Sequence, residues 1–195
     1  MSYQTYTTEA VVCGSRDSNT SDRVYLLFTH SAGMVWATAR SVREERSRQR
    51  YALQDYSYIR VSLVKGKAGW RIGSVESIAN AYLGATHRAG RASVVALVRF
   101  LRRFVQGEEP LPALFTDTVA LLPLLKRLSD MQQGDELMTI FELRALHQLG
   151  YLSSSAVALD VIKAPTIEAV TQVSGLATDI RISQQIVSAK AASQL

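Results

Sequence analysis

Residues 23–39 read RVYLLFTHSAGMVWATA and carry the clearest structural signal in the chain. The first seven residues are rich in the β-branched and aromatic side chains that favour strands. His30-Ser31-Ala32-Gly33 then predicts a tight turn, because Gly33 can adopt a positive φ. Residues 34–39 predict the next strand. The segment therefore indicates two strands joined by a short turn.

Three more strands are predicted within the first 80 residues. An extended stretch surrounds residues 11–13, and residues 58–65 and 70–76 are two strands joined by a glycine-containing turn at 65–69. Five short strands in so short a span are typical of a small barrel or sandwich. A five-stranded barrel of the OB type fits this length, although periodicity alone does not separate it from other small β-folds.

From about residue 80, apolar residues recur with the spacing of amphipathic helices. Gly107 is expected to end the first helix, and Gly150 to cap the third. Pro123 lies inside the second helix and is expected to kink or split it. The predicted helices cover residues 93–106, 111–128, 135–149, 166–173 and 180–192, with a linker or cap at 153–155.

The predicted fold class is therefore α+β. We expect an N-terminal five-stranded OB-type β-barrel over residues 1–80, followed by an all-α helical domain over residues 81–195. A chain of 195 residues is long enough for two small domains. Its 47% hydrophobic and 20% charged residues indicate globular folding rather than disorder.

The charge of the chain is basic and unevenly distributed. The formal net charge is +5 at pH 7, which favours anionic partners such as nucleic acid, an anionic membrane surface or an acidic protein tail. Eleven basic and seven acidic residues lie within residues 1–80, against eleven and ten in the remainder. The excess positive charge therefore belongs to the predicted β-domain.

An arginine-rich loop at residues 40–50 contributes most of this excess. Arginine binds phosphate oxygens through two parallel hydrogen bonds and stacks on bases, and neutralising phosphates releases condensed counterions. Aromatic rings nearby offer surfaces on which the bases of a single strand stack. The predicted DNA contacts are Arg40, Arg43, Arg46, Arg48, Arg50, Lys65, Lys67 and Arg71, interleaved with the aromatics Tyr51, Tyr56, Tyr58 and Trp70.

A solvated loop whose arginines only aid solubility is the alternative interpretation. The aromatic residues are equally compatible with the core or the rim of the barrel. Trp70, at the start of a strand, favours a core position. The position of the loop between two strands of an OB-type barrel favours nucleic-acid binding, because such barrels bind through their loops and one sheet face.

A second basic patch lies in the first predicted helix. Residues 77–107 contain no acidic residue. Arg99, Arg102 and Arg103 are three to four positions apart and can share one helix face. This face predicts either further contacts to DNA, continuing those of the arginine-rich loop, or a binding site for an acidic protein tail with a hydrophobic end. The alternative is a helix face that only contacts solvent.

No catalytic or metal-binding constellation is found in the sequence. Cys13 is the only cysteine, so it cannot form an internal disulfide or a cysteine-based zinc site, and a small buried side chain is expected. His30, His87 and His147 are widely separated. The G-x-x-x-x-G-K-[ST] phosphate-binding loop is absent. We therefore expect no enzyme activity, no cofactor and no metal.

The first ten residues, MSYQTYTTEA, lack the basic and apolar segments of a signal peptide. The longest apolar runs fall short of the roughly 20 residues that span a bilayer. A single cysteine fits a reducing compartment. These features predict a soluble cytoplasmic protein with no membrane partner.

A series of short motifs runs through residues 8–151. They are Thr8-Glu9-Ala10-Val11-Val12, Ser21-Asp22-Arg23-Val24, Leu27-Phe28-Thr29 with Gly33, Ala39-Arg40-Ser41-Val42-Arg43, Ser47-Arg48, Ala52-Leu53-Gln54-Asp55-Tyr56-Ser57, Phe141-Glu142-Leu143-Arg144-Ala145-Leu146 and Leu149-Gly150-Tyr151. In their order and spacing these motifs resemble the RecO family of bacterial recombination mediators. Asp55 departs from the family pattern, in which the Leu-Gln-Pro-Phe/Tyr-Ser segment usually carries proline.

The resemblance implies a mediator that binds single- and double-stranded DNA and anneals complementary strands. It implies RecR and the C-terminal tail of single-stranded-DNA-binding protein (SSB) as partners, with RecA loaded indirectly, in the bacterial cytoplasm at the nucleoid. The arginines of residues 40–50 fall in the family's basic loop. Many members carry a four-cysteine zinc finger after the Leu-Gly-Tyr turn, but this chain has no cysteine there, so no zinc is expected.

Two other function classes compete with this interpretation. One is a protein-binding adaptor whose helical domain docks repair partners while DNA contact is incidental. The other is a nuclease or another enzyme with an unrecognised site. The salt dependence of DNA binding tests the adaptor, and product formation with Mg²⁺ tests the enzyme.

Overall fold

The computed structural model describes residues 5–152, 159–165, 167 and 180–192. Contacts between α-carbons divide the chain into two compact units. The first unit contains Met1–Gly84 and Val105–Pro112, and the second contains Ala85–Phe104 and Ala113–Leu195. The chain therefore returns to the first unit after the second has begun.

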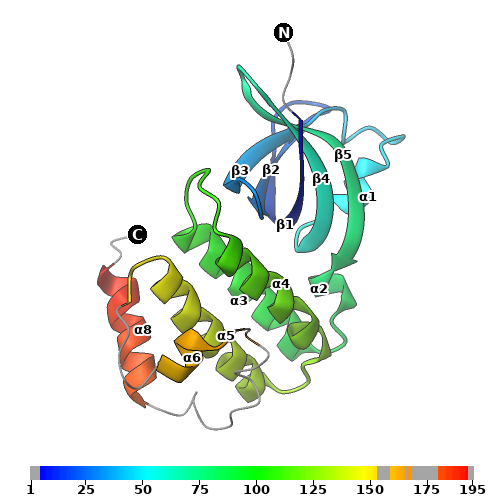
Figure 1. The fold of residues 1–195 in the computed structure, drawn as a ribbon. Coiled ribbons are helices and arrows are strands. Elements are labelled where there is room, and N and C mark those ends of the chain that lie inside the picture. The colour runs from blue at the N-terminus through cyan, green and yellow to red at the C-terminus, as the bar shows by residue number, and fades with distance from the viewer. Residues whose placement is uncertain (1–4, 153–158, 166, 168–179, 193–195) are drawn as a thin grey trace. The chain divides into compact units, whose positions relative to one another are not determined.

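The first unit is a closed barrel of five strands (Figure 1). The strands are β1 (Thr5–Asp17), β2 (Arg23–Thr29), β3 (Gly33–Ala39), β4 (Ser57–Gly66) and β5 (Gly69–Asn80). They are hydrogen-bonded in the order β1-β2-β3-β5-β4, and β1 closes the barrel by pairing with both β2 and β4. Only the β3–β5 pair is parallel among these five pairs. The predicted five-stranded OB-type barrel is confirmed.

The interior of the barrel follows from the alternation of side chains along each strand. In β2, Tyr25 and Leu27 face the core, and in β4 the same holds for Ile59, Val61 and Leu63. Burial of each large apolar side chain contributes roughly 1.5–3 kcal/mol. The buried cluster inside the barrel contains Ala10, Val12, Tyr25, Leu27, Val35, Ala37, Ala39, Val42, Leu53, Ile59, Val61, Leu63, Trp70 and Ile72.

A bulge in β1 changes which of its residues face the core. The pairing of β1 with β2 shifts register between Val12 and Gly14. Val12 belongs to the core before the bulge, whereas after it Ser15 lies opposite the core residue Tyr25. A one-residue shift exchanges the two faces of a strand. The bulge therefore places the next residue, Arg16, on the outer face.

The turn between β2 and β3 contacts a segment that is distant in the sequence. Gly33 has a φ of +62°, which confirms the positive φ expected at this turn. A methyl group added to it would collide with the carbonyl oxygen of Glu109. The amide of Met34 donates to the carbonyl of Gly107 at 2.9 Å. These contacts attach the segment Val105–Pro112 to the barrel.

Replacing Gly33 by alanine is expected to lower the free energy of unfolding by about 2–5 kcal/mol. A left-handed backbone costs about 1–2 kcal/mol for an L-residue, and overpacking adds about 1–3 kcal/mol. Gly107 is the matched control, because its φ is +81° and no atom lies within 4 Å of an added Cβ. Gly107→Ala is expected to lower the free energy of unfolding only by the cost of the left-handed backbone, about 1–2 kcal/mol. Urea unfolding followed by circular dichroism measures both variants, and equal losses would contradict the close contact at Gly33.

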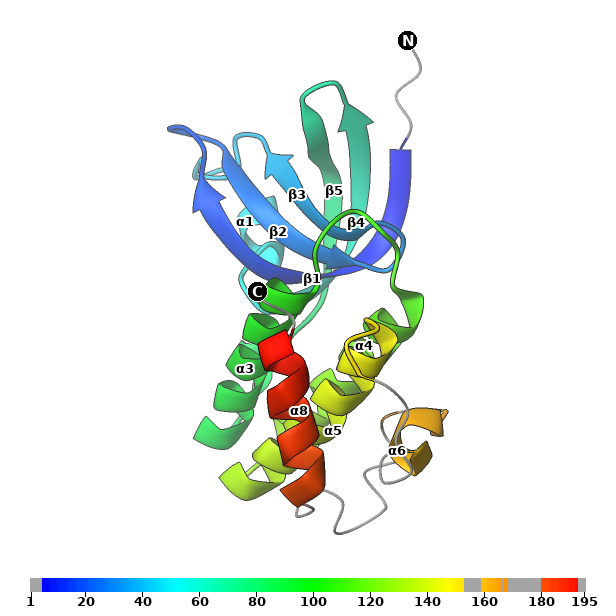
Figure 2. The same cartoon turned by 90° about the vertical axis from the view of Figure 1, so that its left-hand side faces the viewer.

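The second unit is built from helices (Figure 2). The helices described in it are α3 (Arg88–Phe104), α4 (Pro112–Arg127), α5 (Met131–Gln148), α6 (Leu159–Lys163) and α8 (Ile180–Ala192). Within this unit α5 contacts α3, α6 and α8. Two short helices, α1 (Gln49–Ala52) and α2 (Ala81–Gly84), belong to the barrel unit and were not predicted. The predicted helical part of the fold is confirmed.

The predicted helices are present with shifted ends. Helix α3 begins at Arg88, earlier than predicted, and ends at Phe104 rather than at Gly107. Helix α5 also begins earlier, because the side chain of Asp130 accepts a hydrogen bond from the amide of Gln133 and caps the helix. Gly150 follows α5 with a φ of +79°, and its amide donates to the carbonyl of His147, as expected for a C-terminal cap.

Of the two effects predicted for Pro123, a kink or a split of the helix, the split does not occur. Pro123 lies inside one continuous helix, Pro112–Arg127. Proline removes one backbone donor, but Leu121, Leu122 and Leu125 around it are buried, so their packing holds the last turns in the helical conformation. Apart from residue 167, the predicted helix at 166–173 and the linker at 153–155 lie outside the described residues.

Aromatic packing and a buried ion pair hold the helices of the second unit together. Phe100 of α3 and Phe141 of α5 meet edge to face with their ring centroids 5.6 Å apart. Arg144 of α5 donates to both carboxylate oxygens of Asp117 in α4, at 2.9 and 3.0 Å, and to the carbonyl of Val161 in α6 at 2.7 Å. Breaking a buried ion pair costs several kcal/mol, so this contact fixes three helices relative to one another.

Candidate nucleic-acid interface

The arginine-rich loop is attached to the barrel by an apolar residue near each end. Val42 and Leu53 are 1% and 2% exposed and both belong to the barrel core. Their burial stabilises the attachment by roughly 1.5–3 kcal/mol each. Residues 43–50 therefore extend from two fixed points.

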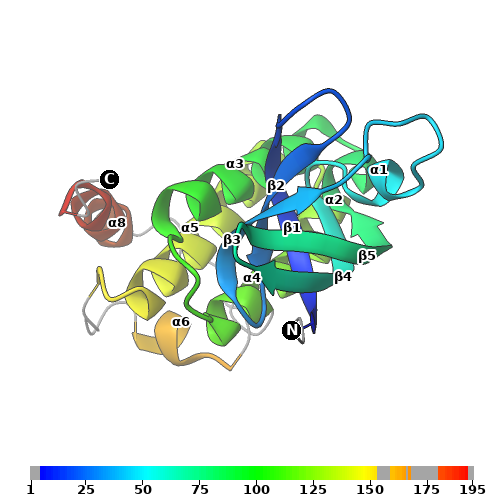
Figure 3. The ribbon, with the colours of Figure 1, turned by 90° about the horizontal axis from the view of Figure 1, so that it is seen from above.

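The start of the loop is bonded to the turn between β1 and β2, and the two segments lie side by side (Figure 3). The amide of Ser41 donates to the Asp22 carboxylate at 2.8 Å, and the Arg43 guanidinium donates to the carbonyl of Asn19 at 2.9 Å. The Ser41 amide, followed by the Asn19 side chain, lowers the pKa of Asp22. The carboxylate therefore stays ionised and the connection persists at neutral pH.

The five loop arginines fall into two groups. The group that projects into solvent consists of Arg40, Arg46 and Arg48. Arg43 also lies 3.5 Å from the carboxylate of Asp17. Arg50 donates to the hydroxyl of Tyr51 at 2.7 Å, and its guanidinium lies 4.7 Å from the centroid of that ring. Arg43 and Arg50 thus help to shape the loop, whereas the first group presents its charge directly to solvent.

A pocket of about 430 Å³ opens between the loop and the barrel. Its charged lining residues are three arginines and one aspartate, a balance that favours an anion. Burial raises the pKa of Tyr25, so its hydroxyl remains a hydrogen-bond donor at neutral pH. The lining residues are Ser15, Arg23, Tyr25, Val42, Arg43, Arg50, Leu53, Gln54 and Asp55.

The hairpin of β4 and β5 contributes Lys65 at the end of β4, Lys67 in the turn and Arg71 in β5. Lys65 donates to Glu108 at 2.6 Å, which lowers the pKa of that carboxyl group, and its ammonium lies 4.9 Å from the ring centroid of Trp70. Lys67 is exposed. Arg71 pairs in register with β3, beyond the turn. Of the two lysines, Lys67 presents the more accessible charge.

Of the four aromatic residues expected to offer stacking surfaces, Tyr51 alone is exposed, at 62%. Trp70 is 7% exposed and belongs to the core, which confirms the core interpretation. Tyr56 stacks on Tyr82 with centroids 5.1 Å apart. The hydroxyl of Tyr58 donates to a carboxylate. Three of the four rings therefore have structural contacts.

The structure also brings forward an aromatic residue that the sequence prediction did not include. Trp36 of β3 is 44% exposed. Its neighbours Val35 and Ala37 are core residues, and the alternation along residues 34–39 was the signal that could have identified it.

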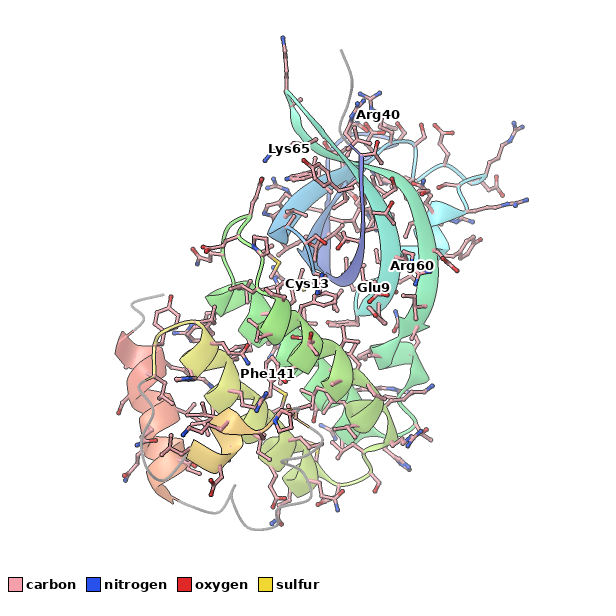
Figure 4. The ribbon with its side chains drawn as sticks, viewed as in Figure 1. Glu9, Cys13, Arg40, Arg60, Lys65 and Phe141 are labelled. Carbon is pink, nitrogen blue, oxygen red and sulfur yellow. The ribbon has the colours of Figure 1, made fainter. Side chains whose placement is uncertain are left out.

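Tyr58 and Glu9 belong to a polar cluster on the barrel. The Tyr58 hydroxyl donates to the carboxylate of Glu9, whose other oxygen lies 3.5 Å from Arg60. Figure 4 shows Glu9 and Arg60 close together on the barrel and away from Arg40. Burial, reinforced by the bond to Glu9, raises the pKa of Tyr58 to about 12. This cluster links β1 to β4, where the barrel closes.

Tyr58→Phe is expected to lower the free energy of unfolding by about 1 kcal/mol at pH 8, the usual contribution of one hydrogen bond. The contribution is fully present below the ordinary tyrosine pKa of about 10 and is lost as the pH rises through about 12. The stability difference between wild type and variant should therefore decrease over this interval. Urea titrations at several pH values measure it. Tyr51→Phe is the control, because it removes a hydroxyl whose bond to Arg50 is exposed to solvent and therefore contributes little. A stability difference at Tyr58 that does not depend on pH would contradict the bond to Glu9.

The second predicted basic patch lies on α3. Arg99, Arg102 and Arg103 are all exposed. The guanidinium of Arg103 lies 5.2 Å from the ring centroid of Phe104. Their spacing of three and four residues places them on one side of the helix. The helical unit therefore presents a basic surface of its own.

The described part of the chain contains neither a cluster of metal ligands nor a membrane-spanning helix. No group of three or more histidine, cysteine, aspartate or glutamate residues there could hold a metal ion. None of the helices described is both long enough and apolar enough to cross a membrane. Cys13 is buried in β1, as predicted, and its thiol donates to the carbonyl of Val11.

Known proteins match both parts of the chain. The family model "Recombination protein O N terminal" matches residues 1–81, and "Recombination protein O C terminal" matches residues 91–155. The chain is 28% identical to the DNA repair protein RecO of Myxococcus xanthus over 148 residues, which cover 75% of this chain and 59% of that protein. It is 30% identical to the DNA repair protein RecO of Heliobacterium modesticaldum over 158 residues, covering 80% and 55%. The chain thus spans little more than half the length of these relatives.

Proposed function

Because the chain belongs to the RecO family, we propose that it is a DNA-binding recombination mediator. In this proposal it binds single- and double-stranded DNA and anneals complementary strands. It acts with RecR to load RecA onto DNA coated with SSB. No bond is made or broken in these steps, so the chain needs a surface for DNA rather than a catalytic centre.

The observation that carries the proposal is the position of the arginine-rich loop. OB-type barrels bind oligonucleotides through the face of strands 2 and 3 and through the loops that join strands 1 and 2 and strands 4 and 5. Residues 40–50 follow β3 directly and are bonded to the β1–β2 turn through Asp22 and Arg43. The loop therefore adds its charge to the surface where barrels of this type receive a strand.

Arginines at this position support annealing in physical terms. Two complementary strands repel each other through their phosphates, and cations bound along the backbones screen that repulsion. Arg40, Arg46 and Arg48 lie within nine residues and project into solvent. Contacts to the backbone carry no sequence information, so the surface suits a protein that must accept any strand.

The basic patch on α3 is proposed as a second contact surface. Arg99, Arg102 and Arg103 suit either the DNA backbone or the acidic tail of SSB, because both are polyanionic. Replacing these three arginines by alanine and measuring the affinity for DNA and for the SSB tail separately shows which of the two ligands the patch binds.

Replacing Arg40, Arg46 and Arg48 by alanine is expected to weaken binding to a single strand and to reduce its salt dependence. Each phosphate contact on a single strand contributes about −0.7 to the slope of log K against log salt concentration, so three lost contacts reduce the slope by about 2. Fluorescence anisotropy of a labelled oligonucleotide, measured from 50 to 300 mM salt, gives the slope. Arg43 and Arg50 are retained because they support the loop itself.

The matched control replaces three exposed basic residues elsewhere, Arg88, Lys126 and Arg127. This control removes the same net charge, so it separates local contact from the general effect of charge. An unchanged slope in the loop variant would sink the loop hypothesis. Binding to a protein partner without any salt-dependent DNA binding would favour the adaptor, and shortening of the DNA in the presence of Mg²⁺ would favour an enzyme.

A further inference from the structure

Trp36 presents a large aromatic ring on the outer face of the barrel. Its neighbours in β3, Val35 and Ala37, belong to the core, so strand alternation turns the indole outward. It is 44% exposed, whereas the other tryptophan of the chain, Trp70, is 7% exposed. An indole gains much free energy from burial. An exposed ring on a hydrogen-bonded strand therefore indicates a surface that binds a partner.

Arg16 lies against this ring. Its guanidinium carbon is 4.7 Å from the centroid of Trp36. The register shift in β1 between Val12 and Gly14 is what brings Arg16 to the outer face. Indole and guanidinium are both planar groups on which nucleobases stack. The pair therefore combines a stacking surface with a positive charge.

The surroundings of Trp36 favour a polyanion. Leu26 of β2 lies directly opposite Trp36 in the ladder. Thr38 follows on the same face of β3, and Arg71 of β5 lies across from it. Arg16 and Arg71 thus come from strands on either side of β3, and none of these five residues is acidic. An apolar partner would gain nothing from the two arginines, whereas a nucleic-acid strand gains from both.

Trp36 is also continuous with the arginine-rich loop. Arg40 lies four residues further along the chain, directly after the end of β3, or about 13 Å away at about 3.3 Å per residue. A strand whose phosphates lie on residues 40–50 can therefore reach the ring along the surface of the barrel. The bases of a duplex are already stacked on one another, so only an unpaired strand offers a free base to the ring.

We propose that Trp36 and Arg16 form a base-stacking site for single-stranded DNA, adjoining the phosphate-binding loop. The proposal rests on the proposed function and adds one property to it. The loop binds backbones of any kind through charge, whereas the Trp36–Arg16 pair selects strands with unpaired bases. Strand preference then originates on β1 and β3 rather than in the loop.

The first test uses the fluorescence of Trp36. Trp70→Phe leaves Trp36 as the single tryptophan, and should that variant not fold, the difference between wild type and Trp36→Phe gives the same signal. The probes are a thymidine oligomer and an abasic oligomer of equal length, which carry the same phosphates. Stacking is expected to quench the emission with the thymidine oligomer and not with the abasic one.

The second test measures affinity. Trp36→Ala is expected to bind the thymidine oligomer about 5- to 150-fold more weakly, the range for one lost stacked base, and the abasic oligomer as wild type does. Trp36→Phe should retain most of the affinity because its ring still stacks. The loop variant lacking Arg40, Arg46 and Arg48 should weaken binding of both oligomers, because they share the same backbone.

The outcomes separate this proposal from the proposed function. Failure of wild type to bind either oligomer would overturn both. Equal wild-type affinity for the two oligomers, with no effect of Trp36→Ala, would overturn the stacking site and leave the phosphate-binding loop intact. An equal loss for both oligomers in Trp36→Ala would assign Trp36 a structural role. Quenching by a repair protein and not by the thymidine oligomer would make it a protein-docking residue.

Discussion

The two hydrogen-bond ladders along β1 are the constraint on which the barrel depends. Residues 10–17 of this strand pair with β2, and residues 5–11 pair with β4. One strand therefore closes the cylinder, and it must change direction within its length to reach both neighbours. The register shift between Val12 and Gly14 accompanies this change and determines which side chains β1 turns outward. Closure of the barrel and the outward position of Arg16 thus have the same origin.

The barrel also holds the arginine-rich loop at residues 40–50 in a defined position. Five arginines in eleven residues repel one another, and charge alone would not hold them in place. Val42 and Leu53 are buried at the two ends, and Asp22 accepts the amide of Ser41 at the beginning. The cost of gathering positive charge is thereby offset by apolar burial and by hydrogen bonds to a neighbouring turn. The residues between the attachments remain available to an anionic partner.

Much of this architecture could be predicted from local sequence, and the remainder depends on long-range contacts. Alternating apolar residues and turn glycines located all five strands, and helical spacing located α3, α4, α5 and α8. Local patterns do not show that Arg43 meets Asp17, or that Arg144 meets Asp117 from another helix. The continuity of α4 through Pro123 depends on packing that a propensity scale does not include. Strand alternation predicts that Trp36 faces outward, but its contact with Arg16 depends on a register shift in another strand that local sequence does not show.

The return of Val105–Pro112 to the barrel unit limits how the chain can be divided into fragments. The chain passes between its two units three times, after Gly84, after Phe104 and after Pro112. A chain cut after Gly84 would therefore lack the carbonyl of Gly107 that accepts the amide of Met34. The barrel unit is thus not one contiguous segment of the sequence. A fragment designed to contain the barrel alone must therefore include residues 105–112 in addition to the five strands.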